Sequence, residues 1–134
     1  MSPIPPRPPN PPQPRGAPRR VLVVDDDEGN ATLLTRLLEL TGHTVKMAAD
    51  GPTALALVDD YRPQVVLLDL GMPGMSGLEV AQHLRAKNLT PQPVLIAVSG
   101  YEKQDLPVEM QDVFDEYVRK PAPLEELQRV VARE

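Results

Sequence analysis

With 134 residues, of which 41% are hydrophobic, the chain can build one domain with a modest core and has no room for a second catalytic domain. The absence of cysteine excludes disulfides and thiolate chemistry, and the 3% aromatic content argues against a base-stacking surface. Residues 1–20 carry +4 within a chain of −5, so the remainder carries −9, and we expect no direct nucleic-acid partner for so acidic a domain.

The N-terminal segment has the composition of a tail or linker. Nine of the 17 prolines precede Arg19, where they remove backbone donors and restrict φ, so residues 1–19 are predicted to be disordered. No secretory signal is visible, and the longest apolar run, Val94–Val98, is too short to span a bilayer. We therefore expect a cytoplasmic protein with no membrane partner, whose folded domain covers residues 20–134.

From residue 20 onward, short apolar runs alternate with longer segments that have helical spacing. In chain order the pattern predicts strand Val21–Val24, helix Asn30–Thr41, strand Thr44–Ala48, helix Asp50–Tyr61, strand Val65–Leu68, helix Ser76–Leu84, strand Val94–Val98, a short helix opened by Pro107, strand Tyr117–Val118 and a final helix that reaches the chain end. This alternation predicts an α/β fold with a five-stranded parallel sheet covered by helices on both faces. We expect a flavodoxin-like, doubly wound sheet of strand order 2-1-3-4-5.

Polar residues follow four of the predicted strands. They are Asp25-Asp26-Asp27, Asp69, Ser99-Gly100 and Arg119-Lys120-Pro121. Ligands of parallel sheets bind at this carboxyl edge, so the four groups are expected to meet there. Aspartates after a strand often serve only as turns and helix caps, and Asp25 to Asp27 alone would be compatible with that role.

The combination of groups at this edge predicts a chemistry. Converging carboxylates repel one another unless a cation neutralises them, and an all-oxygen cluster suits Mg²⁺, or Mn²⁺, better than zinc. Lys120 and Ser99 add a positive charge and a hydroxyl that could receive an incoming phosphoryl group, with Asp69 as the nucleophile.

These motifs together resemble the receiver domain of two-component response regulators. The matching pieces are VLVVDDD, the strand VVLLD with MPGMSG after it, AVSG and YVRKP, in the order of the family and across residues 20–134. The resemblance implies that Asp69 accepts a phosphoryl group from a histidine kinase or a histidine phosphotransfer domain. It also implies a change in a face that binds a downstream protein partner.

The resemblance assigns the metal ligands residue by residue. Asp26 resembles the direct metal ligand, Asp25 its outer-shell partner, and Gly71 the donor of a backbone carbonyl to the metal beside Asp69. Charge alone would also admit Asp27 to the site, but the family pattern favours the first two aspartates and leaves Asp27 to cap the helix that follows.

The resemblance also assigns the phosphoryl contacts and the switch. Lys120 and Ser99 match the residues that contact the phosphoryl oxygens, and Ser99 with Tyr117 matches the switch pair. Gly71 and Tyr101 flank the expected route of a hydrolytic water, and we expect slow self-dephosphorylation because Gly71 cannot orient that water and Tyr101 could cover it. Beyond its own phosphorylation and dephosphorylation, no independent turnover is expected.

Two histidines outside the expected site, and one segment that departs from the family pattern, also need an interpretation. His43 and His83 lie away from the carboxyl edge and are predicted to be solvent-exposed structural residues rather than phosphodonors. Pro107 is expected to shorten the fourth helix, and Val113-Phe114-Asp115 replaces the small residues common in the family before the last strand. The output surface is therefore expected to depart from that of relatives.

Three other readings remain open from the residues. A haloacid-dehalogenase-type phosphatase would need a second Asp two residues after Asp69, where this chain has Gly71. A flavin or nucleotide module would need a phosphate-cradling loop in place of the three aspartates. A degenerate receiver would lack some of the matched residues.

Because no output domain follows the final helix, the chain is expected to be a stand-alone regulator or the receiver segment of a hybrid histidine kinase.

Overall fold

One parallel sheet organises the chain, with its five strands in the predicted order β2-β1-β3-β4-β5. The computed structural model describes residues 18–133, so the predicted disorder of the proline-rich tail falls almost entirely outside the described residues and stays a prediction. The strands are β1 (Arg20–Val24), β2 (Thr44–Ala48), β3 (Val65–Asp69), β4 (Val94–Ser99) and β5 (Glu116–Arg119).

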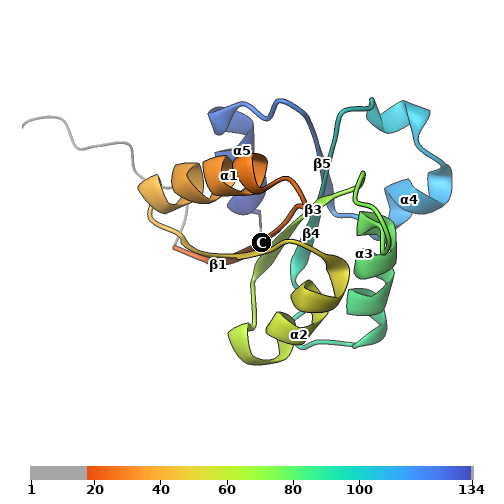
Figure 1. Cartoon of the computed structure of the whole chain (residues 1–134), viewed down its shortest axis with the longest axis horizontal. Coiled ribbons are helices and arrows are strands. Elements are labelled where there is room, and N and C mark those ends of the chain that lie inside the picture. Colours follow the sequence, from red (N-terminus) through yellow and green to blue (C-terminus); the bar gives the residue numbers. More distant parts are fainter. Residues whose placement is uncertain (1–17, 134) are drawn as a thin grey trace, which may run out of the picture.

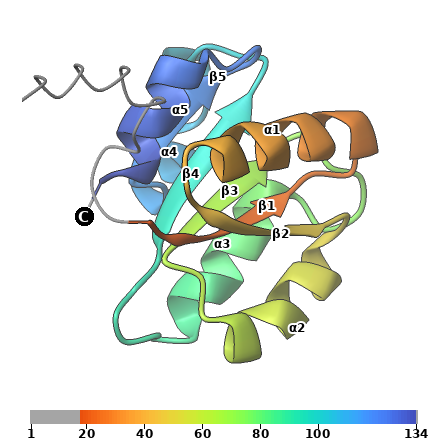
Figure 2. The same ribbon diagram turned by 90° about the vertical axis from the view of Figure 1, so that its left-hand side faces the viewer.

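Helices cover both faces of the sheet, which confirms the predicted layer order. They are α1 (Glu28–Leu40), α2 (Gly51–Tyr61), α3 (Gly77–Ala86), α4 (Val108–Val113) and α5 (Leu124–Val131). Helices α1 and α5 lie on one side of the sheet, whereas α2 and α3 lie on the other, with α4 next to α3 (Figures 1 and 2). Within residues 18–133, no helix is long and apolar enough to cross a membrane.

The two layers of helices enclose two separate apolar cores. Strand β1 shows the division, because Val21 and Val23 pack in the core beneath α1 and α5, whereas Leu22 and Val24 pack in the core beneath α2 and α3. Such alternation follows from the twofold period of a strand. Every residue of β3 and β4 is buried, so the middle of the sheet has little freedom to move.

Side-chain caps begin the helices at the predicted places. The Ser76 hydroxyl accepts a hydrogen bond from the Glu79 amide at 3.2 Å, and Ser76 with Glu79 three residues later has the sequence of a capping box. Asp50 accepts one from the Thr53 amide at 2.8 Å, and Pro52 lies in the first turn of that helix. Local sequence therefore determines where α2 and α3 start.

The segment between β4 and β5 is the least regular part of the described chain. A single 3₁₀ turn, Lys103–Asp105, precedes α4, which has six residues. Pro107 occupies the position before α4 and makes no side-chain cap. The expected short fourth helix is thus confirmed.

Arg19 connects the start of β1 to two other parts of the fold. Its backbone amide donates to His43 Nδ1 at 3.0 Å, and its Nη1 donates to the Val131 carbonyl at 3.0 Å and to the Arg133 carbonyl. The two carbonyls belong to the C-terminal end of α5 and the residues after it. The start and the end of the described domain therefore lie side by side, as Figure 2 shows.

The prediction that His43 is solvent-exposed was wrong, whereas His83 is exposed as predicted. His43 is only 6% exposed, at the opposite edge of the sheet from the aspartates. Burial, followed by the nearby charge of Arg19, lowers the pKa of His43 from its ordinary 6.5. Because Nδ1 accepts the Arg19 amide bond, the imidazole is held in its neutral form.

This arrangement predicts that acid weakens the fold through His43. The unfolded chain binds the imidazole proton at the ordinary pKa of 6.5, whereas the folded chain binds it only at lower pH. Stability is therefore lost as the pH falls through 6.5 and below. In His43→Asn the amide oxygen can still accept the Arg19 bond but does not titrate. Urea unfolding at neutral and mildly acidic pH should show a shallower loss for His43→Asn than for the unaltered protein, and His83→Asn should retain the full loss. Equal pH dependence in all three proteins would refute the assignment.

Candidate functional site

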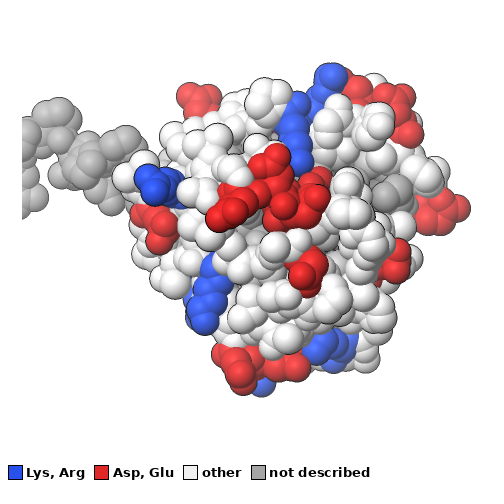
Figure 3. Space-filling view, in the orientation of Figure 1, with Lys and Arg blue, Asp and Glu red and all other residues white. Residues whose placement is uncertain are grey.

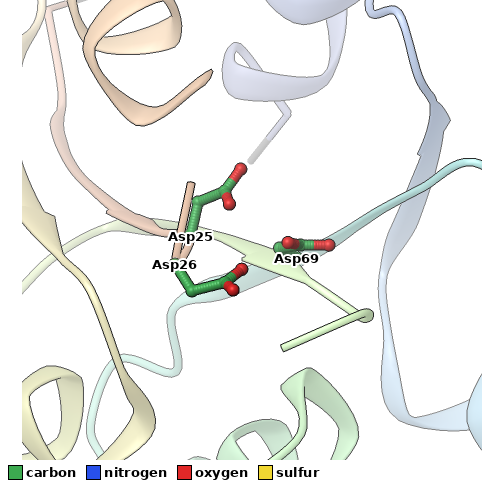
Figure 4. Close-up of side chains that lie close together, drawn as sticks. All are labelled: Asp25, Asp26 and Asp69. Carbon is green, nitrogen blue, oxygen red and sulfur yellow. The ribbon is translucent and has the colours of Figure 1, made fainter. Parts of the chain in front are cut away.

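The aspartates predicted at the carboxyl edge of the sheet do come together. Val24 of β1 pairs with Leu68 of β3, and this register places the residues that follow them, Asp25 and Asp69, side by side. One carboxylate oxygen from each of Asp25, Asp26 and Asp69 lies within 4.8 Å of the other two (Figure 4). Figure 3 shows acidic side chains gathered in the middle of this face of the molecule.

Burial makes the negative charge of Asp25 unfavourable. Its side chain is 2% exposed, and that burial raises its pKa from 3.8 to about 6. The neighbouring charge of Asp69 adds to the rise, whereas the hydrogen bond that Asp25 Oδ1 accepts from the Asp27 amide, 2.9 Å long, opposes it. The site is therefore short of positive charge.

The oxygens of the cluster have the character of metal ligands. Asp25 Oδ2 is buried and has no hydrogen-bond partner among the described residues, although the Lys120 ammonium lies 3.8 Å away. Buried oxygens without a partner are rare in folded proteins. A donor set made only of carboxylate oxygens fits a hard divalent cation such as Mg²⁺, which also keeps waters and phosphate oxygens as ligands. The residues present thus fit the predicted metal.

Lys120 reaches the cluster from the end of β5. Its Nζ lies 3.2 Å from Asp69 Oδ1, and its backbone amide donates to the Ser99 carbonyl at 2.7 Å. This backbone bond holds the start of the Lys120 side chain beside the end of β4, and the ammonium also lies 3.8 Å from Asp25 Oδ2. The structure brings Lys120 and the three aspartates to one place, as predicted from the strand ends.

Ser99, Tyr101 and Tyr117 form a connected group next to the aspartates. Ser99 is 4% exposed, and its hydroxyl oxygen accepts a hydrogen bond from the Tyr101 amide at 3.1 Å. The Tyr117 hydroxyl donates to the carbonyl of the same Tyr101. Tyr101 itself is 70% exposed. The two predicted switch residues are therefore connected through the backbone of Tyr101.

A hollow of about 370 Å³ opens between these groups. Its lining includes Asp69, Gly71, Ser99, Tyr101 and Lys120, which are all predicted site residues. The lining also includes Leu106, which the sequence analysis did not identify. Leu106 lies in the irregular segment before α4, where no periodic pattern indicates which side chains face inward.

The two residues with open assignments lie beside the cluster. The Gly71 amide donates to Asp69 Oδ1 at 3.0 Å, so Gly71 orients the carboxylate. Its proposed carbonyl bond to a metal stays a prediction. Asp27 accepts the Asn30 amide at 3.0 Å as the cap of α1, which gives its carboxylate the capping role that the family pattern favoured.

Comparison with known proteins agrees with this site. Residues 21–132 match the family model described as response regulator receiver domain. The DNA-binding response regulator MtrA of Mycolicibacterium smegmatis is 40% identical over 116 residues, which are 86% of this chain and 50% of MtrA. The response regulator MprA of a Mycobacterium species is 38% identical over 82% of this chain and 47% of that protein. The chain thus spans about half the length of these curated relatives.

Solved structures of the same architecture include proteins from other organisms. Chemotaxis protein CheY4 of Vibrio cholerae has a TM-score of 0.79 at 27% identity and covers 86% of this chain and 97% of that chain. Response regulator TrrA of Thermotoga maritima, solved in complex with Mg²⁺-BeF, has a TM-score of 0.74 at 35% identity and covers 84% of this chain and 96% of that chain. These structures confirm the predicted flavodoxin-like, doubly wound fold.

The expectation that nucleic acid is not a direct partner was wrong. It rested on the −9 charge of residues 21–134, yet relatives that match 86% of this chain are named as DNA-binding response regulators. Electrostatic interactions in physiological salt are screened over about 8 Å. The charge of one domain therefore cannot exclude nucleic-acid binding by another part of a longer polypeptide.

The crowding of charge leads to a prediction for Asp25→Asn. With divalent cations removed by a chelator, this change should increase the free energy of unfolding by an amount on the order of 1 kcal/mol, because it removes a buried charge with a raised pKa. Added Mg²⁺ should stabilise the unaltered protein by mass action and stabilise Asp25→Asn less. Urea unfolding with and without Mg²⁺ measures both effects.

Asp27→Asn is the matched control, because it removes the same charge two residues away and Asn caps a helix as well as Asp does. It should leave the response to Mg²⁺ unchanged. A loss of stability in chelator for Asp25→Asn, or equal Mg²⁺ responses in the two variants, would contradict the prediction.

Proposed function

The chain belongs to the response regulator receiver family, and on that basis we propose that it takes up a phosphoryl group on Asp69 and thereby changes a protein-binding face. The proposed donor is a phosphohistidine on a histidine kinase or a histidine phosphotransfer domain. One observation carries the proposal. The Lys120 ammonium lies 3.2 Å from Asp69 Oδ1, at a hollow that is also lined by Ser99.

The proposed transfer forms one bond and breaks one. An Asp69 carboxylate oxygen attacks phosphorus, the phosphorus–nitrogen bond of the donor breaks, and its electron pair returns to the imidazole nitrogen. Phosphoryl transfer depends mainly on positioning and on neutralisation of the equatorial oxygens. Lys120 is within reach of those oxygens, because its ammonium already contacts the carboxylate that attacks. Mg²⁺ or Mn²⁺ held by Asp25, Asp26, Asp69 and the Gly71 carbonyl would supply the remaining positive charge.

Ser99 supports a proposal for how the phosphorylated state is transmitted. Its hydroxyl oxygen accepts the Tyr101 amide bond, which leaves its proton free for donation to a phosphoryl oxygen. Movement of Ser99 toward that oxygen would pull on the backbone of Tyr101. The Tyr117 hydroxyl, which donates to the Tyr101 carbonyl, would then lose or change its partner. We propose that Tyr117 turns inward in this way.

A protein donor is supported by the surface next to the site. A hollow of about 270 Å³ has Leu33, Leu34 and Leu37 of α1 on one side and Asp25 and Lys120 in the same lining. Leu33 is 57% exposed. Apolar side chains that border a charged site offer a docking surface to a protein rather than to a small anion.

The three alternative functions considered for the sequence have less support. A haloacid-dehalogenase-type phosphatase would use a second acid at the position of Gly71, which offers only backbone atoms. A flavin or nucleotide module would place phosphate at the first turn after β1, where Asp25 and Asp26 would repel it. A receiver without chemistry would not need Lys120 and Ser99 at the same hollow as Asp69.

The central test is measurement of intact mass after incubation with Mg²⁺ and a small phosphodonor such as acetyl phosphate. The unaltered protein should gain a single phosphoryl adduct, and Asp69→Asn should gain none because an amide is not a nucleophile here. Asp27→Asn should keep the adduct, since Asp27 caps α1. An adduct that persists in Asp69→Asn, or that never forms on the unaltered protein, would disprove the assignment.

A second prediction concerns the lifetime of the phosphoryl group. A Cβ at Gly71 would lie 3.6 Å from Asp69 Oδ1, an ordinary contact, so the site can accept a side chain there. The double variant Gly71→Asn with Tyr101→Glu should shorten the phosphoryl half-life by about tenfold or more, because polar groups could then orient the attacking water. Decay of the adduct, followed by mass after removal of the donor, measures this. A half-life that stays the same or lengthens would contradict the role of these two residues.

A further inference from the structure

Gly77, the first residue of α3, lies against the backbone of Asp69. A Cβ at this position would lie 2.4 Å from the Asp69 carbonyl oxygen, 3.0 Å from its carbonyl carbon and 3.1 Å from Leu70 Cα. Carbon and oxygen atoms that are not bonded attract at about 3.5 Å and repel strongly below 3 Å. Only a residue without a side chain fits here unless the backbone moves.

The two elements that meet at Gly77 have little freedom to separate. Strand β3 is buried at every residue and is paired with β1 and β4 on its two sides. The Leu70 amide extends this pairing by donating to the Val98 carbonyl at 3.1 Å. On the other side of the contact, Val80, Ala81 and Leu84 hold α3 in the core with 0% exposure. A shift caused by a side chain at position 77 would therefore fall on the connecting loop, residues 70–76, and on Asp69 itself.

This loop orients the carboxylate of Asp69. The Gly71 amide donates to Asp69 Oδ1 at 3.0 Å, and the Lys120 ammonium lies 3.2 Å from the same oxygen. Displacing the Asp69 carbonyl would change the direction of the amide that follows it and so the position of Gly71. The contact at Gly77 thus acts on the Asp69 carbonyl and on Leu70, and the residue after Leu70, Gly71, donates to the reacting oxygen.

We propose that Gly77 is a positioning residue for the phosphoacceptor. Its missing side chain lets the start of α3 close against Asp69, and this contact sets both the carboxylate and the loop backbone beside it. The inference rests on the proposed function of Asp69 as the acceptor. It adds a residue outside the predicted site that determines how the site is held.

Gly51 provides a matched control, because it is also buried and is also the first residue of a helix, α2. A Cβ at Gly51 would lie 2.6 Å from Met75 Sδ, 2.9 Å from Met75 Cγ and 2.9 Å from Val80 Cγ2. These atoms belong to side chains and not to the backbone of Asp69. Met75 has three rotatable bonds that allow it to move aside, whereas Val80 is β-branched and stiff, so Gly51→Ala also strains the packing of α3. Gly51→Ala should therefore disturb packing without moving the Asp69 backbone.

The test compares Gly77→Ala and Gly51→Ala with the unaltered protein. Phosphorylation by acetyl phosphate, followed by intact mass, should be slower in Gly77→Ala by about tenfold or more, since a displacement of about 1 Å in reacting groups can reduce a rate about 100-fold. Gly51→Ala should remain within about twofold of the unaltered rate. In the protein without Mg²⁺, the amide resonances of Leu70 and Gly71 should shift in Gly77→Ala and not in Gly51→Ala. Urea unfolding establishes the folded fraction of each protein.

The outcomes separate this inference from the proposed function. If the unaltered protein takes up no phosphoryl group, the proposed function fails. If it does, and Gly77→Ala reacts at the same rate as Gly51→Ala, the positioning role is overturned. Equal losses of rate in both variants would overturn it as well, because they would indicate a general effect of stability. If Gly77→Ala is only partly folded, the rates are compared in trimethylamine N-oxide, which favours the folded state.

Discussion

Crowding of negative charge at one edge of the sheet is the constraint on which the rest of the structure depends. Because β1 and β3 are paired and buried in the middle of the sheet, their ends cannot move apart, and Asp25 and Asp69 stay close despite their repulsion. Among the described residues, Lys120 is the only cation within ion-pair distance of these two aspartates. The apolar core thus holds a cluster that would otherwise separate, and a site held under such repulsion is stabilised by any ligand that brings positive charge.

Most residues at the carboxyl edge of the sheet could be predicted from the sequence, because the first polar residue after a fully apolar run shows where the strand ends. Asp25, Asp69 and Ser99 were identified in that way, and parallel pairing then required them to be neighbours. The burial of His43 could not be predicted, because it depends on a bond from Arg19, 24 residues earlier in the chain. The contact of Leu106 with the hollow depends on an irregular loop whose path no period describes. The closeness of Gly77 to Asp69 likewise arises only once both elements are packed, although the glycine itself was visible.

The loop after β4 combines a rigid start with a weakly held continuation. Ser99 is buried at the end of a buried strand, yet the residues that follow form one 3₁₀ turn and a six-residue helix without a side-chain cap. Segments with few buried contacts open at low free energy. The backbone of Tyr101, at the start of this segment, connects Ser99 to β5, since its amide donates to the Ser99 hydroxyl and its carbonyl accepts from the Tyr117 hydroxyl. Small movements at Ser99 would therefore displace the 3₁₀ turn and α4 before they displace the sheet.

The bonds from the Arg19 guanidinium to the Val131 and Arg133 carbonyls give the domain a closed outline. A folded unit whose first and last residues touch can be placed within or beside other sequences without forcing the flanking segments apart. Such a domain can be joined to different neighbouring sequences while its interior stays unchanged. The contact of Arg19 with the C-terminal carbonyls lies at the opposite end of β1 from the aspartates, because Arg19 precedes β1 and Asp25 follows it. Changes in what is attached can therefore accumulate at one edge of the sheet while the opposite edge keeps its geometry.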